Sequence, residues 1–270
     1  MTVYRDRDES VAIEFKNVSK VYDSTGVTAL DKVSFKIYDG EFITIVGGSG
    51  SGKTTLLKMI NKLIEKDEGE IYYYGENLDD LDPIELRRKT GYVVQEIGLF
   101  THMTVEENIS VVPKLLNWNE EKTHRRVEEL LDLVQLDKSK YLKAYPRELS
   151  GGQQQRVGVA RALAADPKIC LMDEPFGAVD AMTRQDLQMS LLDIHQGLGK
   201  KTFILITHDI NEALLLGDRV MIVDEGEILQ FAPGREIVHN PANEKVEHLL
   251  EVLKLQWEQW RDFYDPISGE

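Results

Sequence analysis

The 270-residue sequence contains one cysteine, fewer positive than negative charges and no long apolar run. A single cysteine, Cys170, cannot form an intrachain disulfide, which fits a reducing compartment. Its neighbours Ile169, Leu171 and Met172 are apolar, so we predict a buried core thiol rather than a reactive one. No apolar run approaches the roughly 18 residues of a membrane span, and residues 1–10 lack the apolar stretch of a signal peptide. The chain itself is therefore expected to be cytosolic.

The shortage of positive charge restricts the possible partners. The sequence has 32 Lys and Arg against 47 Asp and Glu, a formal charge of −15. A nucleic-acid binder needs a basic surface, and so does a protein that adheres directly to anionic lipid. We therefore expect no nucleic-acid partner and an acidic, self-repelling surface. The length and the 42% of hydrophobic residues suffice for one large domain or a core with a subdomain.

The most informative stretch runs from Gly47 to Thr54 and reads GGSGSGKT. It fits G-x-x-x-x-G-K-[ST], the pattern of a phosphate-binding loop. The apolar residues 42–46 before it are typical of a buried strand, and residues 54–64 after it have helical spacing. Strand, glycine loop and helix together place backbone N–H groups around an anion at a helix N-terminus. The alternative is a glycine-rich turn beside a surface lysine.

This phosphate loop, residues 47–54, predicts a role for each of its polar residues. Lys53 is expected to reach the β- and γ-phosphates of a nucleotide, and Thr54 to bind Mg²⁺. The other nucleotide-binding residues expected here are Gly47, Gly48, Ser49, Gly50, Ser51, Gly52 and, just beyond the loop, Thr55.

A second stretch, residues 169–174, is an apolar strand that ends in two carboxylates. Asp173 is expected to bind Mg²⁺, and Glu174 to polarise the attacking water as a general base. Two acidic residues after a strand also serve as a helix-start signal. A phosphate loop about a hundred residues upstream favours the site.

Residues 149–156, LSGGQQQR, resemble the signature sequence of ATP-binding-cassette (ABC) ATPases. Ser150 is predicted to cap a helix whose N-terminus forms a second anion site. In that family two chains pair head to tail, with each ATP between one chain's phosphate loop and the other's signature helix. The resemblance implies that Ser150, Gly151, Gly152 and Gln153 contact the nucleotide across a dimer; a plain helix cap is the alternative.

Other family positions follow in the same order, and the resemblance covers about residues 11–240. It implies that Tyr22 stacks on adenine, that Gln95 senses Mg²⁺ and the γ-phosphate, and that His208 contacts the γ-phosphate as a switch. Together with Lys53 and Glu174, Gln95 and His208 form the expected catalytic set, while Thr54, Gln95 and Asp173 form the expected Mg²⁺ set. The stretch Gly177, Ala178, Val179 and Asp180 resembles the loop after the catalytic glutamate, in which Asp180 orders the dimer contact.

A narrower resemblance lies between Met59 and Trp118, where four segments are similar to the ATPase subunits of osmoprotectant importers. These take up quaternary amines such as glycine betaine, choline, carnitine or proline betaine. The resemblance implies a transmembrane permease as partner, an extracytoplasmic substrate-binding protein as an indirect one, and a peripheral position on the inner face of the cell membrane. The chain departs from that pattern at Thr101, where proline is usual, and at Val179, where leucine is usual; the paired CBS domains of many such subunits are not expected here.

Strands that alternate with helices predict an α/β fold with a mainly parallel sheet. The family adds an antiparallel part and a helical subdomain at about 96–160, within an ATPase domain over 11–240. Residues 241–270 are expected to form an amphipathic helical tail that packs on the body or contacts a second chain. Its apolar positions are Val246, Leu249, Leu250, Leu253, Trp257 and Trp260.

The resemblance makes this chain an ATP-binding and ATP-hydrolysing subunit of an importer, with ATP and Mg²⁺ as cofactors. Closure of a homodimer on ATP would act on the permease through the surface after Gln95, including Phe100, His102 and Met103. Three alternatives stay open: an importer ATPase for another small solute such as an amino acid, a soluble ABC ATPase outside transport, and a non-catalytic nucleotide-dependent scaffold.

Overall fold

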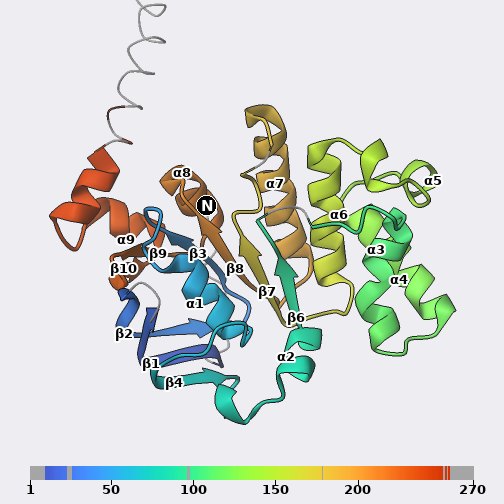
Figure 1. The fold of residues 1–270 in the computed structure, drawn as a ribbon. Coiled ribbons are helices and arrows are strands. Elements are labelled where there is room, and N and C mark those ends of the chain that lie inside the picture. Colours follow the sequence, from blue (N-terminus) through green and yellow to red (C-terminus); the bar gives the residue numbers. More distant parts are fainter. Residues whose placement is uncertain are drawn as a thin grey trace, which may run out of the picture.

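The computed structural model describes residues 10–22, 26–95, 98–177, 179–251, 253 and 255 (Figure 1). The strands are β1 (Val11–Tyr22), β2 (Val27–Tyr38), β3 (Phe42–Val46), β4 (Glu68–Tyr73), β5 (Glu76–Asn77), β6 (Thr90–Val93), β7 (Ile169–Asp173), β8 (Thr202–Thr207), β9 (Arg219–Asp224) and β10 (Glu227–Ala232). The helices are α1 (Lys53–Ile60), α2 (Pro83–Lys89), α3 (Val105–Leu115), α4 (Glu120–Leu133), α5 (Lys138–Tyr141), α6 (Gly151–Leu163), α7 (Ala181–Gly197), α8 (Ile210–Leu216) and α9 (Gly234–His239).

The strands form two sheets. One is antiparallel, in the order β2-β1-β4-β5. The other has the order β10-β9-β3-β8-β7-β6, in which β9, β3, β8, β7 and β6 run parallel and only the edge strand β10 is antiparallel. The predicted α/β fold with a mainly parallel sheet and an antiparallel part is therefore confirmed. Because parallel strands share one direction, the residues that follow β3, β6, β7 and β8 gather at one edge of the sheet.

Helix α1 is enclosed between the two sheets, and its apolar side chains join both. The central strands divide their side chains by strict alternation, because successive side chains of a strand point to opposite faces. Ile204 and Ile206 of β8 face the α1 side, whereas Phe203 and Leu205 face the core under α6 and α7. Both faces of the parallel sheet are thus covered, which explains why β3, β7 and β8 are buried along their whole length.

A third apolar cluster lies over β9, where α8, α9 and the C-terminal helical residues pack together. Val246, Leu250 and Leu253 are buried in it, whereas Trp257 and Trp260 lie outside the described residues. The described part of the predicted tail packs on the body of the protein, which is one of the two arrangements expected for it.

Cys170 is buried on β7, which confirms the prediction of a core thiol. Burial raises the pKa of this thiol to about 12.

One local expectation is wrong, and two elements were not predicted. The helix after the phosphate loop ends at Ile60 rather than at residue 64, since Lys62 adopts a left-handed backbone with φ 48°. The freed carbonyl groups of Asn61 and Lys62 accept from the guanidinium of Arg87 at 3.2 and 2.5 Å. Strand β10 and helix α9 were not predicted at all.

Residues 1–9, Ala178 of the loop after Glu174 and residues 256–270 of the predicted tail lie outside the described residues. Within the part of the chain that is described, no helix is long and apolar enough to cross a bilayer.

Candidate functional site

The phosphate loop is held against the backbone of both sheets. A Cβ atom on Gly47 would lie 2.0 Å from the carbonyl oxygen of Val223 at β9. A Cβ on Gly52 would lie 2.2 Å from the carbonyl oxygen of Ala29 on β2, and Gly52 has φ 104°, which side chains other than glycine rarely allow. Only glycine fits these two positions, so the loop keeps its backbone exposed to an anion at the start of α1.

Lys53 lies across the mouth of this loop. Its ammonium donates to the carbonyl oxygens of Gly47 and Gly48 at 2.8 and 2.7 Å, and the side chain is almost fully buried. Burial lowers the pKa of Lys53, and the nearby carboxylates of Glu174 and Asp173 act in the opposite direction. The lysine is thus already at the position where phosphate oxygens would compete with the loop carbonyls for its protons.

Two oxygen ligands meet beside the loop. The hydroxyl of Thr54 donates to a carboxylate oxygen of Asp173 at 3.3 Å, and burial raises the pKa of Asp173. No group of three or more His, Cys, Asp or Glu residues suited to a metal occurs among the described residues. A hydroxyl and one carboxylate fit Mg²⁺, which binds few protein oxygens and completes its octahedral coordination with phosphates and water.

Close to this pair, the hydroxyl of Tyr22 lies 3.0 Å from that of Thr55. The stacking of adenine on Tyr22 stays a prediction.

Glu174 stands immediately after β7 with an uncommon backbone. Its φ of 46° is left-handed, and such strain in a non-glycine residue concentrates at functional sites. Its amide donates to the carbonyl of Ile206 at 3.0 Å, which fixes the turn. The carboxylate accepts from the side-chain amide of Gln95 at 3.0 Å and lies 3.7 Å from the ring of His208. The structure therefore brings together Gln95, Glu174 and His208, three of the four predicted catalytic residues, while Lys53 lies close enough for their charges to matter.

The loop of His208 has a support that sequence reasoning missed. It lies between β8 and α8, and Asp209 caps α8 by accepting from the amide of Asn211 at 2.8 Å. Glu212 on α8 is 7% exposed and accepts from the side-chain amide of Gln188 on α7, 8% exposed, at 2.9 Å. This buried pair joins the helix after His208 to the helix that follows Glu174.

The signature segment forms the start of α6 as predicted. Ser150 caps the helix by accepting from the amide of Gln153, whose side chain accepts in turn from the amide of Ser150 at 2.9 Å. A Cβ on Gly152 would meet the methyl group of Thr183 at 2.3 Å, so α6 and α7 approach closely at their first turns. Asp180 caps α7 by accepting from the amide of Thr183 at 3.1 Å.

The two helix starts lie apart within one chain. Helix α6 packs on α3, α4, α7 and β6, whereas α1 packs on β2, β7 and β8. Figure 1 shows α1 and α6 well separated, with the central strands and α7 between them. The residues from Ser150 to Gln153 are therefore not brought to the phosphate loop of the same chain.

The segment before α3 forms a firmly held, exposed loop. Asn108 is fully buried, and its side-chain oxygen accepts from the amide of Phe100 at 2.8 Å. Its side-chain nitrogen donates to the carbonyls of Phe100, Met103 and Thr104 at 2.9–3.1 Å. The ring of Phe100 remains 42% exposed, and the ring of His102 lies against it. One buried amide thus shapes a loop that presents an aromatic surface.

The two-sheet α/β fold and the glycine loop at the end of β3 place this chain in the class of phosphate-loop proteins. Residues 30–177 match the ABC transporter family. The glycine betaine/carnitine/choline transport ATP-binding protein OpuCA of Bacillus subtilis is 53% identical over 238 residues, which make up 88% of this chain and 62% of OpuCA. The glycine betaine uptake system ATP-binding protein YehX of Escherichia coli is 47% identical, over 88% of this chain and 76% of YehX. The chain belongs to the ABC transporter family.

A solved structure supports the same assignment. The dimeric ATP-binding cassette MJ0796, in a post-hydrolysis state bound to ADP and Pi, has a TM-score of 0.72 and 36% identity, over 83% of this chain and 99% of that one. The chain spans 62% of the length of OpuCA and of the choline transport protein OpuBA.

Proposed function

We propose that this chain binds ATP with Mg²⁺ and hydrolyses it. The observation that carries the proposal is the convergence of Gln95 and His208 on the carboxylate of Glu174, at the strand end beside the phosphate loop. In this proposal Glu174 accepts a proton from the attacking water, and Gln95 orients its carboxylate. His208 donates to the γ-phosphate. Thr54, Asp173 and Gln95 hold Mg²⁺, which supplies positive charge against the phosphate oxygens when bound.

The other proposed nucleotide contacts come from the loop and from a second chain. Backbone amides of residues 47–55 and the ammonium of Lys53 bind the phosphates, with the ring of Tyr22 against the base. Because the start of α6 lies away from α1, Ser150, Gly151, Gly152 and Gln153 complete the site of a head-to-tail partner. The dimeric MJ0796 cassette bound to ADP and Pi is consistent with this arrangement.

We further propose that hydrolysis drives import of quaternary amines such as glycine betaine, choline or carnitine. The support is the 47–53% identity to proteins named for the transport of these solutes. The proposed partners are a transmembrane permease, contacted through the loop of Phe100, His102 and Met103, and indirectly an extracytoplasmic binding protein. The chain would then lie on the inner face of the membrane, with an ATPase domain at 11–240, a helical subdomain at about 96–160 and a tail at 241–270.

Hydrolysis of Mg²⁺-ATP by the purified chain tests the first proposal. Glu174→Gln should slow turnover by about 10²–10⁴-fold and leave ATP binding intact, because it removes the base without disturbing the loop. Glu227→Gln changes an exposed carboxylate on β10 and is the matched control. Turnover by Glu174→Gln at the normal rate would place the base elsewhere.

To test transport, the permease is co-purified with this chain and the complex is then reconstituted in liposomes. Glycine betaine, choline or carnitine on the binding-protein side should raise hydrolysis above its basal rate, and an amino acid such as glutamine should not. Stimulation by the amino acid alone would replace the solute assignment and leave the ATPase proposal in place.

A further inference from the structure

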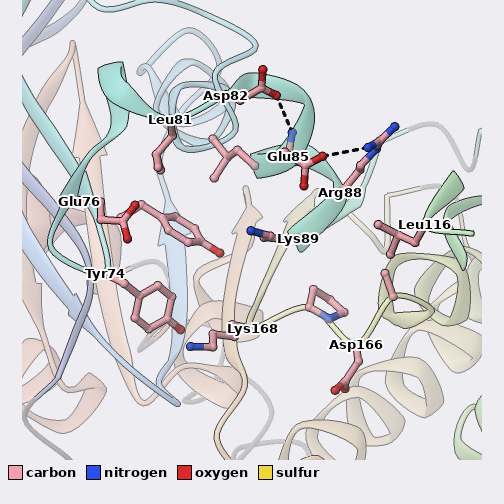
Figure 2. A pocket seen from close by; sticks show the side chains of 14 residues that line it. Tyr74, Glu76, Leu81, Asp82, Glu85, Arg88, Lys89, Leu116, Asp166 and Lys168 are labelled. Atoms are coloured by element: carbon pink, nitrogen blue, oxygen red, sulfur yellow. Dashed lines mark hydrogen bonds and ion pairs between the residues drawn. The ribbon is translucent and has the colours of Figure 1, made fainter.

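A cavity of about 470 Å³ lies at the edge of the parallel sheet opposite the phosphate loop (Figure 2). Four segments distant in sequence line it: the turn between β4 and β5, helix α2 with the two residues before it, Leu116 after α3, and the connection that leads into β7. None of the residues that line it belongs to the site described above.

Strand register places the backbone positions of two cavity-lining lysines side by side. Lys89 precedes β6 and Lys168 precedes β7, and the first residues of these strands, Thr90 and Ile169, are paired. Neighbouring strands lie about 4.8 Å apart, so the two lysines leave adjacent backbone positions. Figure 2 shows the ammonium group of Lys168 beside Tyr74 and that of Lys89 apart from it, nearer α2.

Neither lysine is neutralised within the described chain. No carboxylate lies within ion-pair distance of Lys89 or Lys168 there, although the protein carries 15 excess negative charges. Four carboxylates also line the cavity: Glu85 pairs with Arg88 at 2.9 Å, Asp166 pairs with Lys201 at 2.7 Å, Asp82 caps α2, and Glu76 lies at the rim. An anion in the cavity would meet two ammonium groups that no carboxylate of the described chain neutralises.

The opposite wall is aromatic and fixed. The hydroxyl of Tyr74 donates to a carboxylate oxygen of Asp39 at 2.5 Å, and the ammonium of Lys168 lies 4.7 Å from the centre of the Tyr74 ring. The ring of Tyr73 meets that of Tyr74 edge-on, with centres 5.1 Å apart. A planar or apolar body could therefore pack on rings that are already in place, with little ordering cost. The apolar remainder of the wall is formed by Leu81, Leu86, Leu116, Ala165 and Pro167.

We propose that this cavity binds a small organic phosphate, with its phosphate between Lys89 and Lys168 and its planar or apolar body against Tyr73 and Tyr74. A phosphate monoester matches the two ammonium groups in charge, and lysine binds phosphate as a point charge. Glu76, at the rim, accepts from a hydroxyl or amino group of the ligand. The ligand lies at the opposite end of the two strands that lead to Gln95 and Asp173.

Labelling with pyridoxal 5′-phosphate, a planar phosphate aldehyde, tests the proposal on the full chain carrying Lys53→Ala. The aldehyde condenses with an unprotonated lysine amine, forms a C=N bond and releases water; borohydride then adds hydride to the carbon and fixes the label. Lys89 or Lys168 should be labelled at least about tenfold faster than Lys140, since bound phosphate raises the local aldehyde concentration. Lys140 is the matched control, an exposed lysine 4.9 Å from a tyrosine ring but outside the cavity.

Two further measurements separate a binding site from a reactive lysine. Pyridoxal without phosphate should lose the preference, and AMP should protect both lysines better than inorganic phosphate does. In isothermal titration with pyridoxamine 5′-phosphate, Lys89→Gln and Lys168→Gln should each weaken binding about tenfold or more, and Lys140→Gln should leave it unchanged. Labelling no faster than at Lys140, equal labelling by pyridoxal, or unchanged affinity in both glutamine variants would overturn the proposal.

Discussion

The buried hydrogen bond between Gln188 and Glu212 should contribute more to the free energy of unfolding than hydrogen bonds at the surface do. Gln188→Leu removes the donor 2.9 Å from the carboxylate and leaves that buried oxygen without it, which should cost about 1–3 kcal/mol of unfolding free energy. Glu212→Leu should lower the unfolding free energy by a similar amount, because it leaves the buried side-chain amide of Gln188 without its acceptor. The double variant places apolar groups at both positions and leaves no polar group unpaired. Its loss of unfolding free energy should therefore be about 1–2 kcal/mol smaller than the summed losses of the two single variants.

The same pair predicts a pH dependence. Burial raises the pKa of Glu212, and the hydrogen bonds with Thr207 and Gln188 lower it. Without the bond from Gln188 the pKa rises further, so the folded state holds the proton more tightly than the unfolded state. The stability that comes from this tighter proton binding is fully present below the ordinary pKa of glutamate. It is lost as the pH rises through the pKa of Glu212 in the folded state. The cost of Gln188→Leu should therefore be smaller at about pH 4 than at about pH 7.5.

Urea unfolding followed by circular dichroism measures both effects. Gln185→Leu is the matched control, because Gln185 lies exposed on the same helix, and it should shift stability by less than about 0.5 kcal/mol. If the effects of Gln188→Leu and Glu212→Leu add within about 0.5 kcal/mol, the two residues do not interact as described. A cost for Gln188→Leu that is equal at both pH values would refute the electrostatic part of the reasoning.

Three other outcomes are expected. Cys170, buried with a raised pKa, should not react with a disulfide reagent in the native protein and should react fully in urea; rapid native labelling would contradict its burial. Asn108→Asp turns an oxygen toward three carbonyl groups, so hydrogen exchange of residues 98–104 should speed up at least about tenfold, and unchanged exchange would show that Asn108 does not hold the loop of Phe100. Chains with Lys53→Ala mixed with chains with Ser150→Arg should regain ATP-dependent dimer formation that neither shows alone, since one site of a mixed dimer is intact; no recovery, with mixed dimers present, would rule out the head-to-tail site.

Features with a local pattern could be predicted from the sequence. The glycine loop, the strand that ends in Asp173 and Glu174, and the cap at Ser150 each depend on residues a few positions apart. The structure agrees with them, and it confirms the fold class that the alternation of strands and helices predicted. The family resemblance added Gln95 and His208, whose side chains lie beside Glu174.

What could not be predicted depends on which elements become neighbours. The pair of Gln188 and Glu212 joins two helices across 24 positions, and nothing near either residue indicates the other. The lysines at 89 and 168 are adjacent only because β6 and β7 pair in one register. Strand β10 was missed because its exposed and half-buried residues carry little apolar alternation. Helix α1 ends at Ile60 because Lys62 has a left-handed backbone, and distant Arg87 donates to the carbonyls of Asn61 and Lys62 beyond the helix.

The contacts of Gly47 and Gly52 with opposite sheets bear on the entropy of nucleotide binding. Fixing the backbone of one residue costs about 1–2 kcal/mol, so ordering residues 47–52 would cost roughly 6–12 kcal/mol. In this chain that ordering happens during folding, because the loop is wedged between the carbonyls of Val223 and Ala29. A phosphate therefore meets a rigid receptor, and none of its contact energy is spent on ordering residues 47–52. A side chain at either glycine would therefore harm binding even where the fold survived, because its clash with the carbonyl of Val223 or Ala29 would push the loop out of this position.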